Sequence, residues 1–414
     1  MNSSAISSLR LLFYTLFLAY VCAGIISILP GPTLPLLAKN TGVPLDIAGW
    51  AFTASALGFA LGVMLAGALS GRLGPKFLLM SGMVIMSISG AIIPWTHLFL
   101  LLLITQFILG IGFGFLDVSI NMTVTLAFHD TLNETLNNLH SAYGIGALIA
   151  PLLLSLALQV SHDAILAYLV GSAVGLAGIL LLTRQHVPSI PKQNETQQQR
   201  GTSIPLSLFT QILLWLMVLE MFLYIGAELG FSTWIVTAVS QSAAISLALA
   251  APSATAFWLG LTSGRLLGAQ ALRRGMLSET RLLYLCIVGG GMSGLLVAFF
   301  PGQIGISFSA SALVGFFFGP IFPGIMAIAS RWFVRALGLV SGVLLTSAGA
   351  SGMILPVFIG FLIAHVGVNW GMATPAIICL IIILPLSLAL RQQRRTLHLQ
   401  ADEHTMKYPL PLIK

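Results

Sequence analysis

Charged residues are scarce in this chain, and their scarcity excludes most classes of protein. Only 7% of the 414 residues are Asp, Glu, Lys or Arg, whereas 57% are hydrophobic. A soluble domain carries roughly 25% charged residues because it needs a hydrated surface. So few polar groups cannot cover so apolar a chain, which excludes a soluble enzyme, a disordered scaffold and a nucleic-acid binder. The solvent of this protein must be largely lipid.

Cysteine and catalytic motifs are scarce as well. The three cysteines, Cys22, Cys286 and Cys379, lie in separate apolar runs and form no C-x-x-C pair. We therefore expect small buried side chains there rather than a metal site or a disulfide. Gly-x-Ser-x-Gly, P-loop and H-E-x-x-H patterns are absent from the sequence, so we expect no enzymatic activity and no organic cofactor.

Long hydrophobic runs are abundant instead, and they are rich in glycine and proline. The chain contains 42 glycines and 19 prolines, and both are commoner in membrane helices than in soluble ones. Because a helix needs about 20 apolar residues to cross a bilayer, the sequence predicts an all-α polytopic membrane protein with twelve spans. These spans lie near residues 9–37, 48–70, 76–95, 98–128, 136–160, 164–183, 207–239, 247–270, 282–300, 304–330, 336–365 and 370–390.

One polar segment divides these spans into two sets of six. Residues 184–206 contain prolines and glutamines with almost no apolar content, which is typical of a flexible linker. We therefore predict an N-terminal six-helix bundle over residues 1–183 and a C-terminal bundle over residues 207–390. A second polar segment, residues 391–414, is predicted to be a tail.

Basic residues predict how the chain is oriented. On a path of twelve crossings, 17 of the 18 lysines and arginines fall on the side of both termini and the linker, and only Lys39 falls on the other side. Because lysine and arginine are enriched in cytoplasmic loops, we predict a multi-pass protein of the cell membrane with cytoplasmic N- and C-termini. The net charge of +7 then reflects topology. We expect a monomer whose partners are the lipid bilayer and a small-molecule substrate, and not nucleic acid.

The two sets of spans repeat each other. Glycine and proline positions recur at an offset of 205 residues, so that Gly110, Gly114, Gly144 and Pro151 correspond to Gly315, Gly319, Gly349 and Pro356. Parallel halves of six helices, with a binding site near the midplane between them, are a transporter architecture.

The segment between the second and third predicted spans carries a family resemblance. Gly67-Ala-Leu-Ser-Gly71-Arg72-Leu-Gly74-Pro-Lys76 is similar to the cytoplasmic loop signature of the major facilitator superfamily, although Gly71 stands where that family usually has aspartate. The departure argues against the family's usual charge contact between this loop and the eleventh helix. The resemblance implies a conformational loop motif made of Gly67, Gly71, Arg72, Gly74, Lys76 and, in the repeated half, Arg265.

Within that superfamily, three further segments resemble the fucose–galactose–glucose:proton symporters and the related sodium-dependent glucose transporter-like proteins. They are Gly114-Phe-Leu-Asp117-Val-Ser-Ile-Asn121, Asn138-Leu-His140-Ser-Ala-Tyr143 and Leu223-Tyr224-Ile-Gly226-Ala-Glu228-Leu-Gly-Phe-Ser-Thr-Trp234. The resemblance implies cation-coupled sugar transport. However, Gly31 and Pro32 stand where the proton symporters carry an acidic residue before Leu-Pro, so their coupling mechanism does not transfer intact.

Three acidic residues, Asp117, Glu220 and Glu228, fall inside predicted spans, and no lysine or arginine is placed near the middle of any span. An ionised acid at a helix centre costs ~2.5–3.5 kcal/mol on insertion scales, so each acid must be protonated or meet a cation. We therefore predict that Asp117, Glu228 and His140 couple transport to a proton or a sodium ion. The alternative for these residues is a structural hydrogen bond between helices. For Glu220, a functional role and packing near the cytoplasmic end of its helix both stay open.

A sugar site combines polar groups for the hydroxyls with aromatic faces for the ring. Asp117 and Asn121 are four residues apart and share one helical face. By the repeat, Phe322 opposes Asp117, which predicts a site that is polar on the N-terminal half and apolar on the C-terminal half. The predicted substrate-binding residues are Asp117, Asn121, His140, Tyr143, Tyr224, Glu228, Trp234, Trp258 and Phe322.

These features predict a secondary active transporter that moves a small polar solute, a monosaccharide, by cation-coupled alternating access. Two alternatives stay open on the sequence alone. A multidrug or amphiphile/lipid exporter of the same fold is favoured by the apolar C-terminal half. A non-transporting solute sensor is favoured by the missing acids, at Gly71 and on the first helix.

Overall fold

Helices make up almost all of the computed structural model, which describes residues 3–128, 131–185, 187 and 208–393. Over these residues the protein is all-α, as predicted, and contains no strand. Ten of its helices are long and apolar enough to cross a membrane, so the chain is a multi-pass membrane protein. Most of the predicted linker and tail lie outside the described residues.

The helices follow one another in two groups. The first comprises α1 (Ser3–Ile28), α2 (Pro30–Thr41), α3 (Leu45–Ala48), α4 (Trp50–Ile92), the 3-10 turn η1 (Ile93–Trp95), α5 (Phe99–Ala127), α6 (Leu132–Val160) and α7 (Ile165–Thr183). The second comprises α8 (Ile212–Ala243), α9 (Leu247–Ala250), α10 (Pro252–Arg273), α11 (Glu279–Phe299), α12 (Ile304–Phe318), α13 (Ile321–Trp332), the 3-10 turn η4 (Val334–Ala336), α14 (Leu337–His365) and α15 (Val368–Ile381).

The ten apolar helices are consistent with twelve crossings. The 43 residues of α4 contain two predicted spans that run into one another. The 22-residue helix α10 corresponds to the span predicted over 247–270, but its arginines, serines and threonines make it less apolar than the rest. The exact boundaries of the two bundles stay predictions.

Proline and glycine interrupt several spans. Pro30 begins α2 directly after α1, and Gly319 and Pro320 separate α12 from α13, because proline lacks the amide hydrogen and clashes with the preceding turn. The spans predicted over 9–37 and 304–330 are therefore each two helices. Gly74 interrupts α4 at φ 76°, which is a conformation that glycine adopts without strain.

Close backbone contacts hold equivalent helices together in the two groups. A Cβ atom on Gly110 would lie 2.0 Å from the Ser55 carbonyl oxygen, so α5 lies directly against α4. A Cβ atom on Gly315 would lie 1.9 Å from the Phe257 carbonyl oxygen, so α12 lies directly against α10. Small residues allow such approaches between membrane helices. The two glycines occupy the positions that the predicted repeat pairs.

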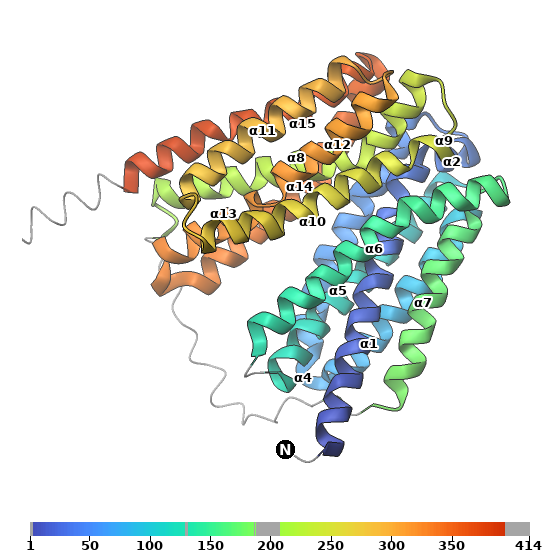
Figure 1. Cartoon of the computed structure of the whole chain (residues 1–414). Helices are drawn as coiled ribbons and strands as arrows, with labels where there is room; N and C mark the ends of the chain where they lie inside the picture. Colours follow the sequence, from blue (N-terminus) through green and yellow to red (C-terminus); the bar gives the residue numbers. More distant parts are fainter. Residues whose placement is uncertain (1–2, 129–130, 186, 188–207, 394–414) are drawn as a thin grey trace, which may run out of the picture.

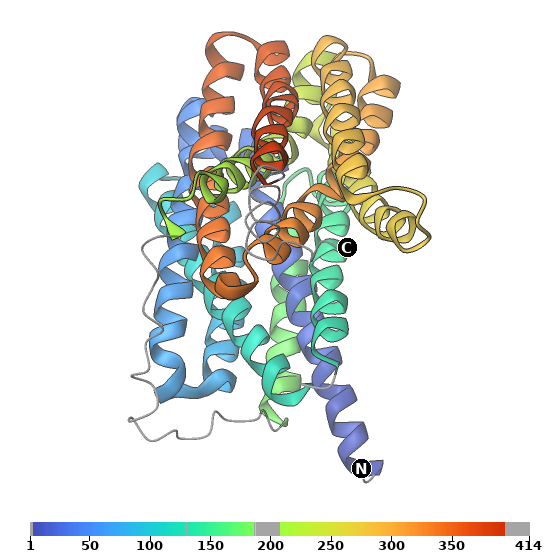
Figure 2. The ribbon, with the colours of Figure 1, turned by 90° about the vertical axis from the view of Figure 1, so that its left-hand side faces the viewer.

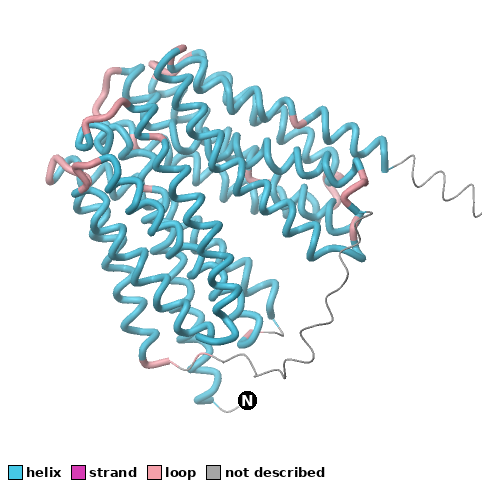
Figure 3. The backbone as a smooth tube through the Cα atoms, turned by 180° about the vertical axis from the view of Figure 1, so that it is seen from behind, coloured by secondary structure: helices cyan, strands magenta, loops and turns pink. Residues whose placement is uncertain are grey.

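The two groups of helices meet at one end and diverge toward the other. We call the end where α2 and α8 finish the far side, and the end where α1 begins and α7 finishes the terminal side. Figure 1 shows α2 and α9 close together at the far side, with the blue-to-green and yellow-to-red helices spreading apart from there. The same divergence is visible from behind in Figure 3. In Figure 2 the yellow-to-red helices lie mostly above the blue and green ones.

Hydrogen bonds join the two groups on the far side. The Ser155 hydroxyl at the end of α6 donates to the Ala248 carbonyl oxygen of α9 at 2.6 Å. The Thr255 hydroxyl of α10 donates to the Leu148 carbonyl oxygen of α6 at 3.1 Å. These bonds hold the two groups of helices together, so the far side of the protein is closed in this conformation.

Toward the terminal side, α4 and α14 separate. The Thr53 hydroxyl donates to the Met353 carbonyl oxygen at 2.6 Å. Gly71 is 18 residues further along α4, about five turns away on the same helical face, and no atom lies within 4 Å of a Cβ built there. The same is true of Gly67 on α4 and of Gly338 on α14. The two faces are thus in contact at Thr53 and uncovered beyond it.

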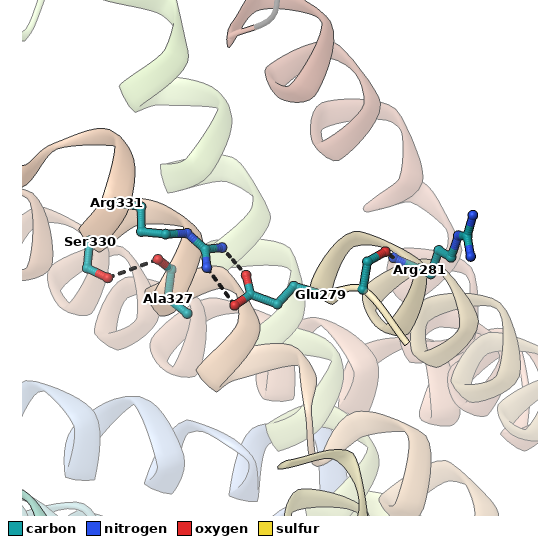
Figure 4. A network of polar contacts seen from close by, with 6 residues as sticks. Glu279, Arg281, Ala327, Ser330 and Arg331 are labelled. Atoms are coloured by element: carbon teal, nitrogen blue, oxygen red, sulfur yellow. Dashed lines mark hydrogen bonds and ion pairs between the residues drawn. The ribbon is translucent and has the colours of Figure 1, made fainter. Parts of the chain in front are cut away.

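An ion pair ties two helices of the second group on the terminal side (Figure 4). Arg331, at the end of α13, donates to both carboxylate oxygens of Glu279, at the start of α11. Its side chain is 56% exposed and that of Glu279 is 30% exposed. Pairs exposed to this degree contribute up to about 1 kcal/mol, so the contact orients the helix ends more than it stabilises the fold.

Candidate functional site

Asp117 is held by a tyrosine from another helix. The hydroxyl of Tyr20, on α1, donates to Asp117 Oδ1 on α5 at 2.7 Å. Tyr20 is only 1% exposed, whereas Asp117 is half-buried. The bond therefore fixes the carboxyl group of Asp117 between α1 and α5. Tyr20 was not predicted as a site residue, because a tyrosine in an apolar run carries no signal of the helix that its hydroxyl will meet.

Asn121 lies one turn beyond Asp117, as the spacing predicts. Its amide nitrogen donates to the backbone carbonyl of Asp117 at 2.8 Å rather than to the carboxyl group. The side chain of Asn121 therefore lies along its own helix. It also interacts with the hydroxyl of Tyr20, which brings all three residues into one cluster.

α6 adds His140 and Tyr143 to this cluster. The His140 ring is exposed, and its centroid lies 5.4 Å from that of Tyr20. The Tyr143 ring stacks on Phe113 with centroids 5.8 Å apart, and its hydroxyl lies 3.1 Å from Ser27 Oγ. We call Tyr20, Asp117, Asn121, His140 and Tyr143 the N-terminal cluster.

The second group of helices supplies a matching polar cluster. The Tyr224 hydroxyl bonds to Glu228 Oε2, one turn along α8, and lies 3.0 Å from the Phe318 carbonyl oxygen. Arg265 of α10 also interacts with Tyr224, and its Nε donates to the Gly319 carbonyl oxygen at 3.3 Å. We call Tyr224, Glu228 and Arg265 the C-terminal cluster.

Arg265 overturns two expectations from the sequence. As the counterpart of Arg72 it was expected in a loop motif, but it lies inside α10, which continues to Arg273. The reason is that helical geometry is interrupted at Gly74, only two residues after Arg72. After Arg265, the next glycine with a positive φ is Gly275, beyond the end of α10. Arg265 and Glu228 both interact with Tyr224, so a basic side chain belongs to the same polar cluster as Glu228. The C-terminal half of the site is also polar rather than purely apolar.

The two clusters face the same region between the two groups of helices. His140 interacts electrostatically with Asp117 of its own group and with Arg265 of the other. Tyr143 likewise interacts with both Asp117 and Glu228. The structure thus brings together six predicted site residues and Arg265 from α5, α6, α8 and α10.

Three predicted aromatic site residues are buried or partly buried in the packing between helices. Trp234 is fully buried, and its Nε1 donates to the Pro356 carbonyl oxygen at 2.7 Å, so it packs α8 against α14 and lines no site in this conformation. Trp258 is 4% exposed, and its Nε1 has no hydrogen-bond partner among the described residues. Phe322, on α13, is partly buried against the core.

The predicted loop motif is a break in a helix rather than a loop. The helix α4 runs through it, and only Gly74 leaves helical geometry. Lys76 donates to the carbonyl oxygens of Thr183 at 3.2 Å and Gln185 at 2.6 Å, so it ties α4 to the end of α7. Arg72 is exposed on the terminal side. Neither residue contacts the second group of helices through a hydrogen bond in the described structure.

The site is suited to a polar organic solute rather than to a multivalent metal. Among the described residues, no group of three or more His, Cys, Asp or Glu side chains could hold a metal ion. What the two clusters offer instead is carboxyl, hydroxyl, imidazole and guanidinium groups from both sides of one region. Such groups form hydrogen bonds with hydroxyl-rich molecules.

Known proteins resemble this chain over most of its length. A sequence profile described as Major Facilitator Superfamily matches residues 16–309 and 280–412. The chain is 24% identical to sodium-dependent glucose transporter 1 of Xenopus laevis over 364 residues, which cover 80% of this chain and 72% of that protein. It is also 24% identical to the glucose/mannose transporter GlcP of Bacillus subtilis over 357 residues, which cover 83% and 85% of the two chains. A solved structure of the Escherichia coli fucose:proton symporter FucP shares the fold, with a TM-score of 0.61 and 19% identity over 92% of this chain and 99% of that one.

Proposed function

This chain belongs to the Major Facilitator Superfamily, and from that premise we propose that it carries a monosaccharide across the membrane by cation-coupled alternating access. The observation that carries the proposal is the convergence of the two clusters. Each group of helices contributes one acid, Asp117 or Glu228, and each acid is bonded to a tyrosine, Tyr20 or Tyr224. A solute between them would contact both groups, so its binding would respond to their relative position.

Alternating access is supported by the asymmetry of the two ends. Hydrogen bonds join the two groups on the far side, whereas the glycine faces of α4 and α14 are uncovered toward the terminal side. In the opposite conformation these glycine faces would meet and the far side would part. Gly67, Gly71 and Gly74 would then act as the conformational motif that the family resemblance implies.

A sugar as the solute is supported by the relatives. Two of them, each matched over more than two thirds of its length, are named as transporters of glucose or of glucose and mannose. Carboxyl and amide groups bind sugar hydroxyls, and Tyr143 would offer an aromatic face. We propose Asp117, Asn121, His140, Tyr143, Glu228 and Arg265 as substrate-contacting residues, with Asp117, His140 and Glu228 also serving the coupling ion.

The orientation and surroundings follow from charge. We propose that the terminal side faces the cytoplasm of a cell membrane, because a path of twelve crossings puts most of the basic residues of the sequence on that side. The conformation described here would then be open to the inside. The coupling ion would be a proton or sodium, and a single chain would suffice, since both clusters come from it.

The test is transport by the purified protein reconstituted in liposomes that contain buffer without radiolabelled glucose. Radiolabelled glucose should accumulate under an inward gradient of protons or of sodium. Asp117→Asn should reduce accumulation to the level of empty liposomes while exchange of labelled for unlabelled glucose continues, because the amide keeps the hydrogen-bonding shape but cannot ionise. Glu134→Gln, at an exposed acid in the first turn of α6, is the matched control and should behave as wild type.

The same assay separates the alternatives. Accumulation by Asp117→Asn equal to that of wild type would remove the coupling role. Efflux of a lipophilic cation without sugar movement would favour the exporter. Sugar binding in a thermal-shift assay without any flux would favour the sensor.

A further inference from the structure

We propose that Glu220 is a proton-binding residue of the transport cycle, protonated in the conformation described here and deprotonated in the opposite one. The proposal rests on the transport function proposed above. It adds a third acid to Asp117 and Glu228, at a position that neither the family resemblance nor the two clusters include.

Glu220 lies in the third turn of α8 and is completely buried, with 0% of its surface exposed. Neither of its carboxyl oxygens has a hydrogen-bond partner among the described residues. A buried carboxylate without a donor is far less stable than the neutral acid, because burial penalises the charged form. Glu220 therefore carries a proton in this conformation.

No charged neighbour offers another way to stabilise the carboxylate. Within the described chain, no charged or titratable group interacts with Glu220. The titratable side chains on the helices that pack against α8, and on α8 itself, are Lys39 of α2, Arg265 and Arg273 of α10, Arg331 of α13, His365 of α14, Cys379 of α15, and Tyr224 and Glu228.

The isolation of Glu220 also identifies the cation. A metal cation bound by a protein needs several oxygen ligands at once, and among the described residues Glu220 belongs to no group of three or more His, Cys, Asp or Glu side chains that could hold one. A proton needs only one oxygen, because it forms a covalent O–H bond. Glu220 is thus suited to binding a proton.

The position of Glu220 connects it to the C-terminal cluster. Glu220, Tyr224 and Glu228 follow one another at intervals of four residues, so they lie along one face of α8. The Tyr224 hydroxyl is already bonded to Glu228 and lies beside the Phe318 carbonyl oxygen, just before the break between α12 and α13. A shift of α13 at that break would change the surroundings of this face. We expect it to admit water to Glu220 in the opposite conformation, where the proton leaves to that water.

Infrared spectroscopy of the purified protein tests the protonation directly and requires no sugar. At neutral pH, the wild-type spectrum should contain an absorption band of a protonated carboxyl group that Glu220→Gln removes and Glu134→Gln leaves unchanged. The same band in wild type and Glu220→Gln would overturn the proposal, because Glu220 would then be ionised.

Transport tests the role in the cycle. One pH unit changes the equilibrium of each transported proton tenfold. If Glu220 carries a coupled proton, Glu220→Gln should lower the glucose accumulation ratio by up to about tenfold under a gradient of about one pH unit. It should also keep glucose exchange, because the neutral amide replaces the neutral acid. Glu220→Asp retains a titratable group and should keep accumulation above that of Glu220→Gln.

The outcomes distinguish this proposal from the proposed function. Wild-type accumulation and pH dependence in Glu220→Gln would overturn the role of Glu220 while leaving sugar transport intact. Absence of glucose movement in wild type would instead overturn the proposed function, whereas the infrared result would still decide whether Glu220 is protonated. Loss of exchange in Glu220→Gln, with the fold intact by thermal unfolding, would mean that the acid is needed for the conformational change itself and would also overturn the proposal.

Discussion

Replacing Gly67 by tryptophan should hold the protein open on the terminal side. Gly67 is exposed on α4, and no atom lies within 4 Å of a Cβ built on it. The new side chain would therefore meet nothing in the conformation described here. Gly67 lies 14 residues from Thr53, and Gly338 lies 15 residues from Met353 on the antiparallel helix α14. The two glycines are thus level with each other along the two helices.

The expected cost of the tryptophan follows from the distance between α4 and α14 at Thr53, where the two helices are in contact. At Thr53 a hydroxyl bonds directly to the Met353 carbonyl oxygen at 2.6 Å, which leaves no room for a large side chain between the helices. If α4 and α14 approach equally closely at Gly67 in the opposite conformation, tryptophan must be accommodated by displacement. Overpacking of this kind costs about 1–3 kcal/mol, which corresponds to roughly a 5- to 150-fold shift of the equilibrium.

Two measurements on the same variant test this reasoning. Spin labels on α4 near Gly71 and on α14 near Gly338, both on the terminal side, should report the longer distance in Gly67→Trp under all conditions, and glucose exchange should fall by about the factor above. Gly305→Trp is the control, since Gly305 lies near the start of α12 and also meets no atom within 4 Å. Exchange by Gly67→Trp at the wild-type rate would refute the idea that these faces close.

Two further predictions concern charged contacts. Arg265→Gln should lower kcat/KM for glucose by about tenfold or more, because hydrogen bonds from a charged donor contribute ~1.5–3 kcal/mol. Its thermal unfolding should be unchanged because Arg265 is exposed, and equal kinetics would exclude Arg265 from the site. On the far side, Asp46 of α3 and His365 of α14 lie 4.0 Å apart with 16% and 51% exposure. A double-mutant cycle with Asp46→Asn and His365→Ala should give a coupling of about 0.2–1 kcal/mol that falls as salt is added, because partly exposed pairs are weak and are screened by ions; a coupling that added salt leaves unchanged would disprove an ion pair.

Helical spacing predicted which polar residues share a face but not which residues from other helices they meet. Asp117 and Asn121 lie one turn apart, as expected. Their shared partner Tyr20 could not be predicted, because the rotation of α1 about its axis depends on packing against α6 and α7. The roles of these residues in binding and coupling stay predictions until transport is measured.

Two residues were placed wrongly from the sequence, in opposite ways: Trp234 was expected at the site, and Arg265 was expected away from it. Trp234 belongs to a family-like string, yet α8 turns it toward α14, where Gly360 leaves room for its ring. Arg265 resembles a loop residue, yet α10 carries it into the polar region between the helix groups. In both cases the segment is helical, as its apolar run predicts. The misplacement arose because neither pattern specifies where a helix ends or how it is rotated.

The sequence by itself determined the class of this protein, because 57% hydrophobic and 7% charged residues leave lipid as the only suitable solvent. Its periodicity also determined the spans and the repeat, since each depends on residues close together in the chain or at a constant offset. Only the tertiary structure decided which end is closed, that Arg265 joins the cluster of Tyr224 and Glu228, and that Glu220 is buried with no hydrogen-bond partner among the described residues. Those facts depend on contacts between different helices, such as that of Arg265 with the Gly319 carbonyl oxygen. The rotation and tilt of these helices are determined by packing and not by the pattern of any one segment.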